Sequence, residues 1–213
     1  MLLENERELV SKYGRELIKK GLTTGTGGNI SIYNPDKKLV AIKPSGIDYF
    51  KIKPEDVVVV NLAGNIYDGD KKPSSELQMH LEVYKNREDV GAVIHTHSIY
   101  STTIACMNWE IPAVHYLVAF AGNKVPCAEY ASFGSRELAD NAIKALGQKY
   151  NASLLANHGL LAVGSDIDAA LATAEEIEFS AEVYYRSRNL GEPVILSEDE
   201  MEIMAEKFKN YGQ

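Results

Sequence analysis

The sequence predicts an α/β or α+β domain built on one predominantly antiparallel central sheet with helices at its periphery. Three observations lead to this fold class. The first half of the chain is rich in short strand-like segments, the second half alternates strand-like and helix-like segments, and both ends carry helical patterns. A length of 213 residues leaves room for one large domain with a substantial core, so we expect residues 1–213 to form a single domain.

The first predicted elements are a helix and two hairpins. Residues 2–20 carry apolar side chains at helical spacing, and Gly21 follows as a C-terminal cap. The segments 29–33 and 39–43 flank an Asn-Pro-Asp turn, which predicts a hairpin. The segments 57–60 and 66–67 flank Ala-Gly-Asn and predict a second hairpin.

Strands and helices alternate in the rest of the chain. Ser75 and Gln78 form a capping box that predicts a helix to about Asn86. The remaining predicted elements are a strand over 91–97, a helix over 98–107, a strand over 125–130, a helix over 135–146, strands over 152–157 and 160–163, a helix from a Ser165/Asp168 cap to Leu190, and a last helix capped by Ser197 and Glu200.

Composition and charge exclude several classes of protein. With 22 basic and 30 acidic residues, the net charge of -8 argues against binding nucleic acid or an anionic membrane through bulk charge. The apolar stretches fall short of the roughly 18 residues that span a bilayer, and the charged start lacks the apolar region of a signal peptide. We therefore expect a cytoplasmic protein with no membrane or nucleic-acid partner. Cys106 and Cys127 lie among apolar neighbours, so we expect buried free thiols.

Three histidines give the strongest local signal for chemistry. His95 and His97 stand two apart in a predicted strand, so both imidazoles point to one face, about 7 Å apart, and can converge on one metal ion. His158 ends a separate apolar strand, where Gly159 lets the backbone turn sharply. Three imidazoles leave an open position for substrate, as catalytic zinc sites do. The alternative is that the H-x-H spacing is chance and that His158 satisfies a hydrogen bond in the core.

Glu76 is the best carboxylate candidate, because a helix start projects it outward after a polar loop. It would serve as a metal ligand or a base. Alternatively it only complements the helix dipole, a contribution of about 0.3 to 1 kcal/mol. His80 is an i,i+4 neighbour of Glu76, and we expect it in the core or behind the ligands rather than among them.

Three short polar loops are candidates for phosphate binding. Residues 25–29 (GTGGN) resemble an anion-cradling loop, because glycines let consecutive backbone N–H groups point at one phosphate, although the loop matches neither a P-loop nor a dinucleotide fingerprint. Residues 44–46 (PSG) and 74–75 (SS) are further small polar loops. Each alone is an ordinary turn, but together they supply the donors that a phosphate needs in an acidic protein.

Tyr116 and Tyr211 are polar aromatics in suggestive places, but with twelve tyrosines in the chain neither is informative alone.

The combination of these motifs resembles the class II aldolase and adducin-head family, and within it the zinc-dependent L-fuculose-1-phosphate aldolases. The resemblance covers nearly the whole chain, because it also includes residues 111–138, the N-H-G-L segment 157–160 and residues 207–212. It implies a three-layer α/β/α fold and a homotetramer with active sites at subunit interfaces.

The resemblance also implies a role for each candidate residue. His95, His97 and His158 would bind one zinc ion per subunit, with Glu76 as a fourth ligand that leaves the metal to act as base. Tyr116 would be the general acid/base on the aldehyde side. The phosphate-binding groups would be Thr26, Asn29, Ser45, Gly46, Ser74 and Ser75. The acceptor pocket would be lined by Phe133 and Tyr211, with Tyr116 and Tyr211 serving a neighbouring subunit's zinc. Gly27 replaces an alanine of some relatives and should only loosen the turn.

The activity implied by the resemblance is reversible cleavage of L-fuculose 1-phosphate to dihydroxyacetone phosphate and L-lactaldehyde through a zinc-stabilised enediolate. One alternative is a pentulose-5-phosphate 4-epimerase of the same family, which residues 111–116 disfavour. A second is a zinc hydrolase, which three phosphate-type loops disfavour. A third is a non-catalytic adducin-like interaction module, which the presence of every ligand, base and phosphate position disfavours.

Overall fold

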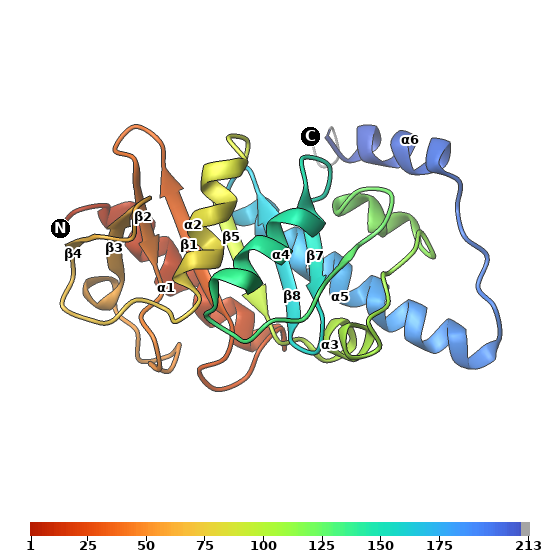
Figure 1. The fold of residues 1–213 in the computed structure, drawn as a ribbon, viewed down its shortest axis with the longest axis horizontal. Coiled ribbons are helices and arrows are strands. Elements are labelled where there is room, and N and C mark those ends of the chain that lie inside the picture. Colours follow the sequence, from red (N-terminus) through yellow and green to blue (C-terminus); the bar gives the residue numbers. More distant parts are fainter. Residues whose placement is uncertain (210–213) are drawn as a thin grey trace.

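The computed structural model describes residues 1–209, and eight strands within this range form one sheet (Figure 1). The strands are β1 (Asn29–Asn34), β2 (Leu39–Ile42), β3 (Val58–Asn61), β4 (Ile66–Asp68), β5 (Ala92–Thr96), β6 (Cys127–Ala128), β7 (Ala152–Leu155) and β8 (Gly159–Gly164). Their order is β4-β3-β2-β1-β5-β8-β7-β6, and of these neighbours β6 and β7 are parallel while the others are antiparallel. The expected predominantly antiparallel central sheet is confirmed.

Helices cover both faces of the sheet, which confirms the three-layer architecture. In Figure 1, α2 (Leu77–Asn86) and α4 (Arg136–Leu146) lie in front of the sheet, and α1 (Glu4–Lys19) and α5 (Ile167–Leu190) lie behind it. The remaining helical elements are η1 (Pro54–Asp56) against α1, α3 (Ile99–Cys106) and η2 (Tyr116–Phe120) against α5, and α6 (Glu198–Lys209) against η2.

The alternation of side chains along each strand produces two hydrophobic cores. In the segment 57–60, Val57 and Val59 belong to the core beneath α1 and α5, whereas Val58 and Val60 belong to the core beneath α2 and α4. All four are fully buried, because the sheet is covered on both faces. Val93 of β5 also faces α2 and α4. His95, two residues further along, therefore points to the same layer.

Several predicted element boundaries are wrong for identifiable reasons. The strand expected over 125–130 is reduced to two residues, because Pro126 lacks the N–H that a ladder requires. The Ser75/Gln78 capping box does not form: the side chain of Gln78 donates to Glu82 instead. At the start of α5 the capping residue is Asp166, which accepts from the backbone N–H of Ala169.

Two further expectations concern the cysteines and membranes. Both thiols are free, as expected, but neither is buried, since Cys106 is exposed and Cys127 is half-buried. Among residues 1–209, no helix combines the length and the apolar character needed to cross a membrane.

Candidate active site

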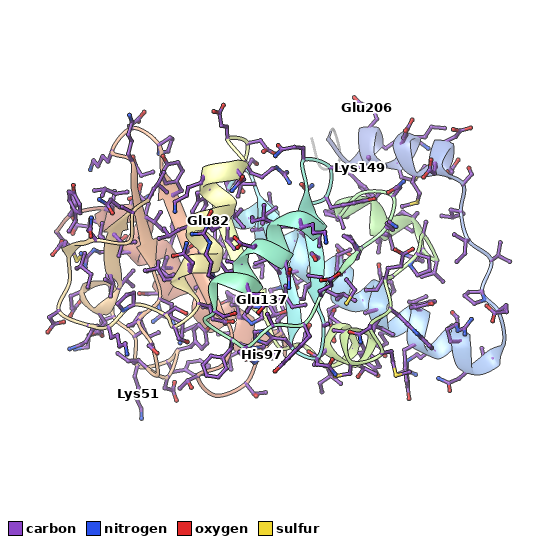
Figure 2. All side chains as sticks on the ribbon, viewed as in Figure 1. Lys51, Glu82, His97, Glu137, Lys149 and Glu206 are labelled. Atoms are coloured by element: carbon purple, nitrogen blue, oxygen red, sulfur yellow. The ribbon has the colours of Figure 1, made fainter. Side chains whose placement is uncertain are left out.

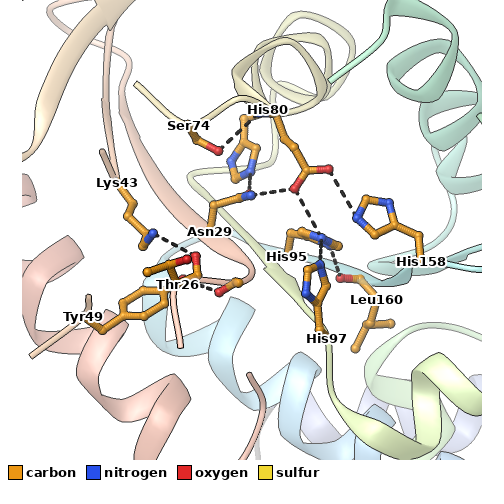
Figure 3. Close-up of polar contacts among 12 residues, drawn as sticks. Thr26, Asn29, Lys43, Tyr49, Ser74, His80, His95, His97, His158 and Leu160 are labelled. Carbon is orange, nitrogen blue, oxygen red and sulfur yellow. Dashed lines mark hydrogen bonds and ion pairs between the residues drawn. The ribbon is translucent and has the colours of Figure 1, made fainter. Parts of the chain in front are cut away.

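The candidate site lies where β1, β5 and the start of α2 meet (Figure 3). Asn29 of β1 is the register partner of His95 of β5, so their side chains share the face that α2 covers. Glu76 immediately precedes α2, and its backbone N–H donates to Ser74 Oγ over 3.2 Å. His97 follows the last residue of β5, and Figure 2 shows it on the opposite side of the molecule from Glu206 of α6.

Three imidazoles converge at this end of β5. The ligand nitrogens of His95, His97 and His158 all lie within 4.8 Å of one another. His95 donates its Nδ1–H to the carbonyl of Leu160 over 2.9 Å, so its Nε2 is free to offer a lone pair to a metal ion. The Nε2 atoms of His95 and His97 lie 2.9 Å apart. Tetrahedral zinc ligands at bonding distance are separated by about 3.3 Å. The spacing is therefore close to that of a shared metal ion.

Glu76 completes the group with a buried carboxylate. Its Oε2 accepts from Asn29 Nδ2 over 2.8 Å and lies 3.4 Å from His95 Nε2. Its Oε1 is buried with no hydrogen-bond partner and lies 3.5 Å from His158 Nε2. A buried carboxylate oxygen without a partner is costly unless a cation or a proton satisfies it. Three imidazoles and one carboxylate form a donor set that suits zinc, so the residues present fit a divalent metal ion.

The environment of His95 and His97 favours the neutral form of their imidazoles. Burial, followed by the neighbouring His158 and His97, lowers the pKa of His95 well below its usual value. Burial and His158 lower the pKa of His97 in the same way. Imidazole binds a metal ion only when it is neutral, so both shifts favour the metal-binding form at neutral pH.

Glycines let the histidine-bearing segments approach one another, although not as the sequence predicts. Asn157, rather than Gly159, adopts the left-handed conformation at the turn, with φ of 54°. Gly159 is needed for another reason, because a Cβ there would collide with the carbonyl oxygen of Thr96. A Cβ on Gly27 would lie 2.9 Å from His97 Nδ1. Gly27 therefore makes room for a candidate ligand, which is more than the loosened turn expected from the sequence.

A cavity of about 380 Å³ opens beside the histidines. Its wall brings together all three polar loops, Glu76, His97 and His158. The predicted substrate-binding residues that line it are Thr26, Asn29, Ser45, Gly46, Ser74, Ser75 and Phe133. Backbone hydrogen bonds join two of the loops, since Ser45 N–H donates to the carbonyl of Lys72 and Ser74 N–H donates to the carbonyl of Lys43.

Lys43 lines the same cavity and is a residue that the sequence analysis missed. Its Nζ donates to the carbonyls of Thr26 (3.2 Å) and Pro44 (3.3 Å), and it lies 4.5 Å from the centre of the Tyr49 ring. Burial lowers its pKa to about 8. The available signal was a lysine at the end of the apolar segment 39–42, directly before the Pro-Ser-Gly loop. Among the described residues of the cavity wall, Lys43 supplies the cationic side chain.

Of the two tyrosines predicted for the site, the structure places Tyr116, and it lies away from this cavity. Tyr116 is 45% exposed at the start of η2, where its ring stacks on Phe208 and packs against His115. It is not part of the described cavity wall. Tyr211 lies outside the described residues.

Comparisons with known proteins agree with this geometry. The model of the Class II Aldolase and Adducin N-terminal domain family matches residues 8–185. The chain is 55% identical, over 100% of both sequences, to the 5-deoxy-D-ribulose 1-phosphate aldolase of Bacillus thuringiensis serovar kurstaki. It is 40% identical to the L-fuculose phosphate aldolase of Escherichia coli strain K12, over 92% of this chain and 91% of that one. A solved structure of an L-fuculose 1-phosphate aldolase superposes with a TM-score of 0.93 at 48% identity, covering 96% of each chain.

Proposed function

The chain belongs to the class II aldolase and adducin N-terminal domain family, and on that premise we propose that it is a metal-dependent aldolase cleaving a ketose 1-phosphate to dihydroxyacetone phosphate and a short aldehyde. The observation that carries this proposal is the shared cavity. One wall holds His97, His158 and the Glu76 carboxylate, with the buried His95 beside them, and the other holds three small polar loops and a lysine. The loops can thus bind the phosphate group of a small substrate while the metal ion contacts oxygen atoms of the same molecule.

His95, His97 and His158 would hold the metal ion, with Glu76 close enough to join them in the resting state. The metal supplies a Lewis acid for the negative charge that develops on substrate oxygens during cleavage. We propose zinc, one ion per subunit, because imidazole nitrogens and one carboxylate are typical zinc ligands.

The side chains of the cavity have separate tasks. Lys43 and the loop donors bind the phosphate and fix the position of C3 relative to Glu76. Glu76 returns a proton to C3 after the C3–C4 bond breaks, and it removes that proton in the reverse direction. Glu76 is only 5% exposed, so most water is kept away from its carboxylate during this proton transfer.

We propose that Tyr116 acts on the site of a neighbouring subunit in a homotetramer, since it is exposed and does not line the cavity of its own chain. There it would take the C4 hydroxyl proton. Mixing equal amounts of Tyr116→Phe and His95→Ala chains tests this arrangement. Random reassembly into cyclic tetramers should restore about a quarter of the sites, because each restored site pairs intact histidines with a neighbour's intact Tyr116. No recovery after confirmed subunit exchange would refute it.

The substrate that we propose from the motifs is L-fuculose 1-phosphate. A second candidate, 5-deoxyribulose 1-phosphate, is favoured by the activity named for the relative that is 55% identical. The two differ on the aldehyde side, where cleavage yields L-lactaldehyde or acetaldehyde. A mainly apolar pocket discriminates weakly against an added hydroxyl, by about 100-fold at most, whereas a pocket built to bind that hydroxyl discriminates far more strongly.

The deciding experiment measures release of dihydroxyacetone phosphate from both ketose 1-phosphates and epimerisation of L-ribulose 5-phosphate, each with and without chelator. Chelator-sensitive release from either ketose 1-phosphate supports the aldolase, and the ratio of the two kcat/KM values identifies the preferred substrate. Conversion of L-ribulose 5-phosphate to its epimer alone would establish the epimerase instead. Inactivity toward all three, in protein shown to contain metal, would refute the proposal.

A further inference from the structure

A chain of buried polar side chains runs behind Glu76, away from the cavity. Asn29, whose Nδ2 donates to Glu76 Oε2, presents its Oδ1 to His80 Nε2 at hydrogen-bonding distance (Figure 3). His80 Nδ1 lies 2.7 Å from Ser31 Oγ, which lies 2.7 Å from the hydroxyl of Tyr84. Each of these four residues is at most 4% exposed. The chain therefore connects α2 to β1 and back to the carboxylate without solvent.

The carboxylate determines the direction of the three hydrogen bonds from Glu76 to Ser31. Ionised Glu76 can only accept, so Asn29 must present its NH₂ group to Glu76 and its oxygen to His80. His80 must then carry its hydrogen on Nε2, which leaves Nδ1 to accept from Ser31 Oγ. Burial lowers the pKa of His80 to about 3, so the ring is neutral and holds one hydrogen.

We propose that His80 is a positioning residue that holds the amide of Asn29 in one orientation, and through it the carboxylate of Glu76, for the proton transfer at C3; this inference rests on the proposed function. Without the Nε2–H donor, Oδ1 of Asn29 loses its partner, and the amide is held at one end only. The amide can then swing, and the carboxylate that it contacts moves with it. Glu76 Oε1 has no hydrogen-bond partner, so the hydrogen bond from Asn29 to Oε2 orients the carboxylate between His95 and His158.

Two variants of His80 separate its two hydrogen bonds. The side-chain NH₂ of glutamine matches the position of Nε2 along the side chain, so His80→Gln retains a donor toward Asn29 and loses the acceptor for Ser31. Asparagine is one bond shorter, so His80→Asn retains the group near Ser31 and loses the donor toward Asn29. We expect His80→Asn to lower kcat about 100-fold, the effect of a misplaced reacting group, and His80→Gln to lower it less than about 5-fold. The KM for substrate should change far less than kcat in both variants, because the phosphate-binding groups other than Asn29 stay in place, and the metal content should match the wild type, because the three histidines are unchanged.

The thermal midpoints of both variants serve as the structural control, and comparable midpoints with unequal kcat support positioning. Equal losses of kcat in the two variants would overturn the inference. A second measurement needs neither variant to be active: ¹H–¹⁵N spectra of the wild type, with the His80 signals assigned by their absence in His80→Gln. We expect the neutral Nε2–H tautomer, and the Nδ1–H tautomer would overturn the inference. A wild type that cleaves none of the substrates would refute the proposed function, and the tautomer would still decide the hydrogen-bond arrangement.

Discussion

Replacing Lys43 with methionine should stabilise the fold and weaken substrate binding at the same time. The lysine is 2% exposed, and burial lowers its pKa from 10.5 to about 8. A difference of about 2.5 pKa units, at about 1.36 kcal/mol per unit, corresponds to about 3 kcal/mol that the charged form costs the folded state at pH 7. Its two hydrogen bonds and the Tyr49 contact disappear in the variant, so we expect a net gain of about 1 to 3 kcal/mol in the free energy of unfolding.

The lowered pKa of Lys43 also predicts how the stability difference between the wild type and Lys43→Met changes with pH. Between pH 8 and 10.5 the unfolded chain holds the Lys43 proton and the folded protein does not, so wild-type stability rises with pH across this window. Below pH 8 the full cost is present. The advantage of Lys43→Met should therefore be largest at pH 7 and shrink toward pH 10. Urea unfolding at fixed protein concentration, at four pH values, measures it.

The exposed Lys51, labelled in Figure 2, provides the matched control. Lys51→Met should leave both the stability and its pH dependence near the wild type. A Lys43→Met protein that is less stable than the wild type at pH 7, or whose advantage does not change with pH, would refute the reasoning. The same variant should raise the KM for the phosphorylated substrate about 10- to 100-fold, since a hydrogen bond to a charged group is worth about 1.5 to 3 kcal/mol.

Three other substitutions test the remaining parts of the site. Glu76→Gln should abolish deuterium exchange at C3 of dihydroxyacetone phosphate while metal stays bound; unchanged exchange would show that another group is the base. Gly27→Ala places a Cβ 2.9 Å from His97 Nδ1, so the imidazole must move, and metal affinity by competition with a chromophoric chelator should fall about 10- to 100-fold; affinity equal to the wild type would contradict the role given to Gly27. Tyr116→Phe should depress cleavage far more than the C3 exchange, and equal losses of both would mean that Tyr116 is structural.

Much of the fold and part of the site could be predicted from local sequence. The helical stripe of residues 2–20 and the β-branched segment 57–60 report their own secondary structure, because burial imposes a period of 3.6 or 2 on apolar residues. The H-x-H spacing at His95 and the three polar loops could also be predicted, because each is a short contiguous segment of the sequence. The family suggested by these motifs is confirmed.

The juxtapositions in the site were decided only by the tertiary structure. Asn29 meets Glu76 from 47 positions away, and His95 meets Leu160 from 65 positions away, because β5 lies between β1 and β8 in the sheet. Local pattern determines which face a side chain takes, but the order and register of the strands determine what it faces there. The carbonyl partners that hold Lys43 in the cavity wall, and the placement of His80 against Asn29, depend on that order. Apart from Lys43, the chemical groups of the site could therefore be identified from the sequence, whereas their distances and their protonation required the folded chain.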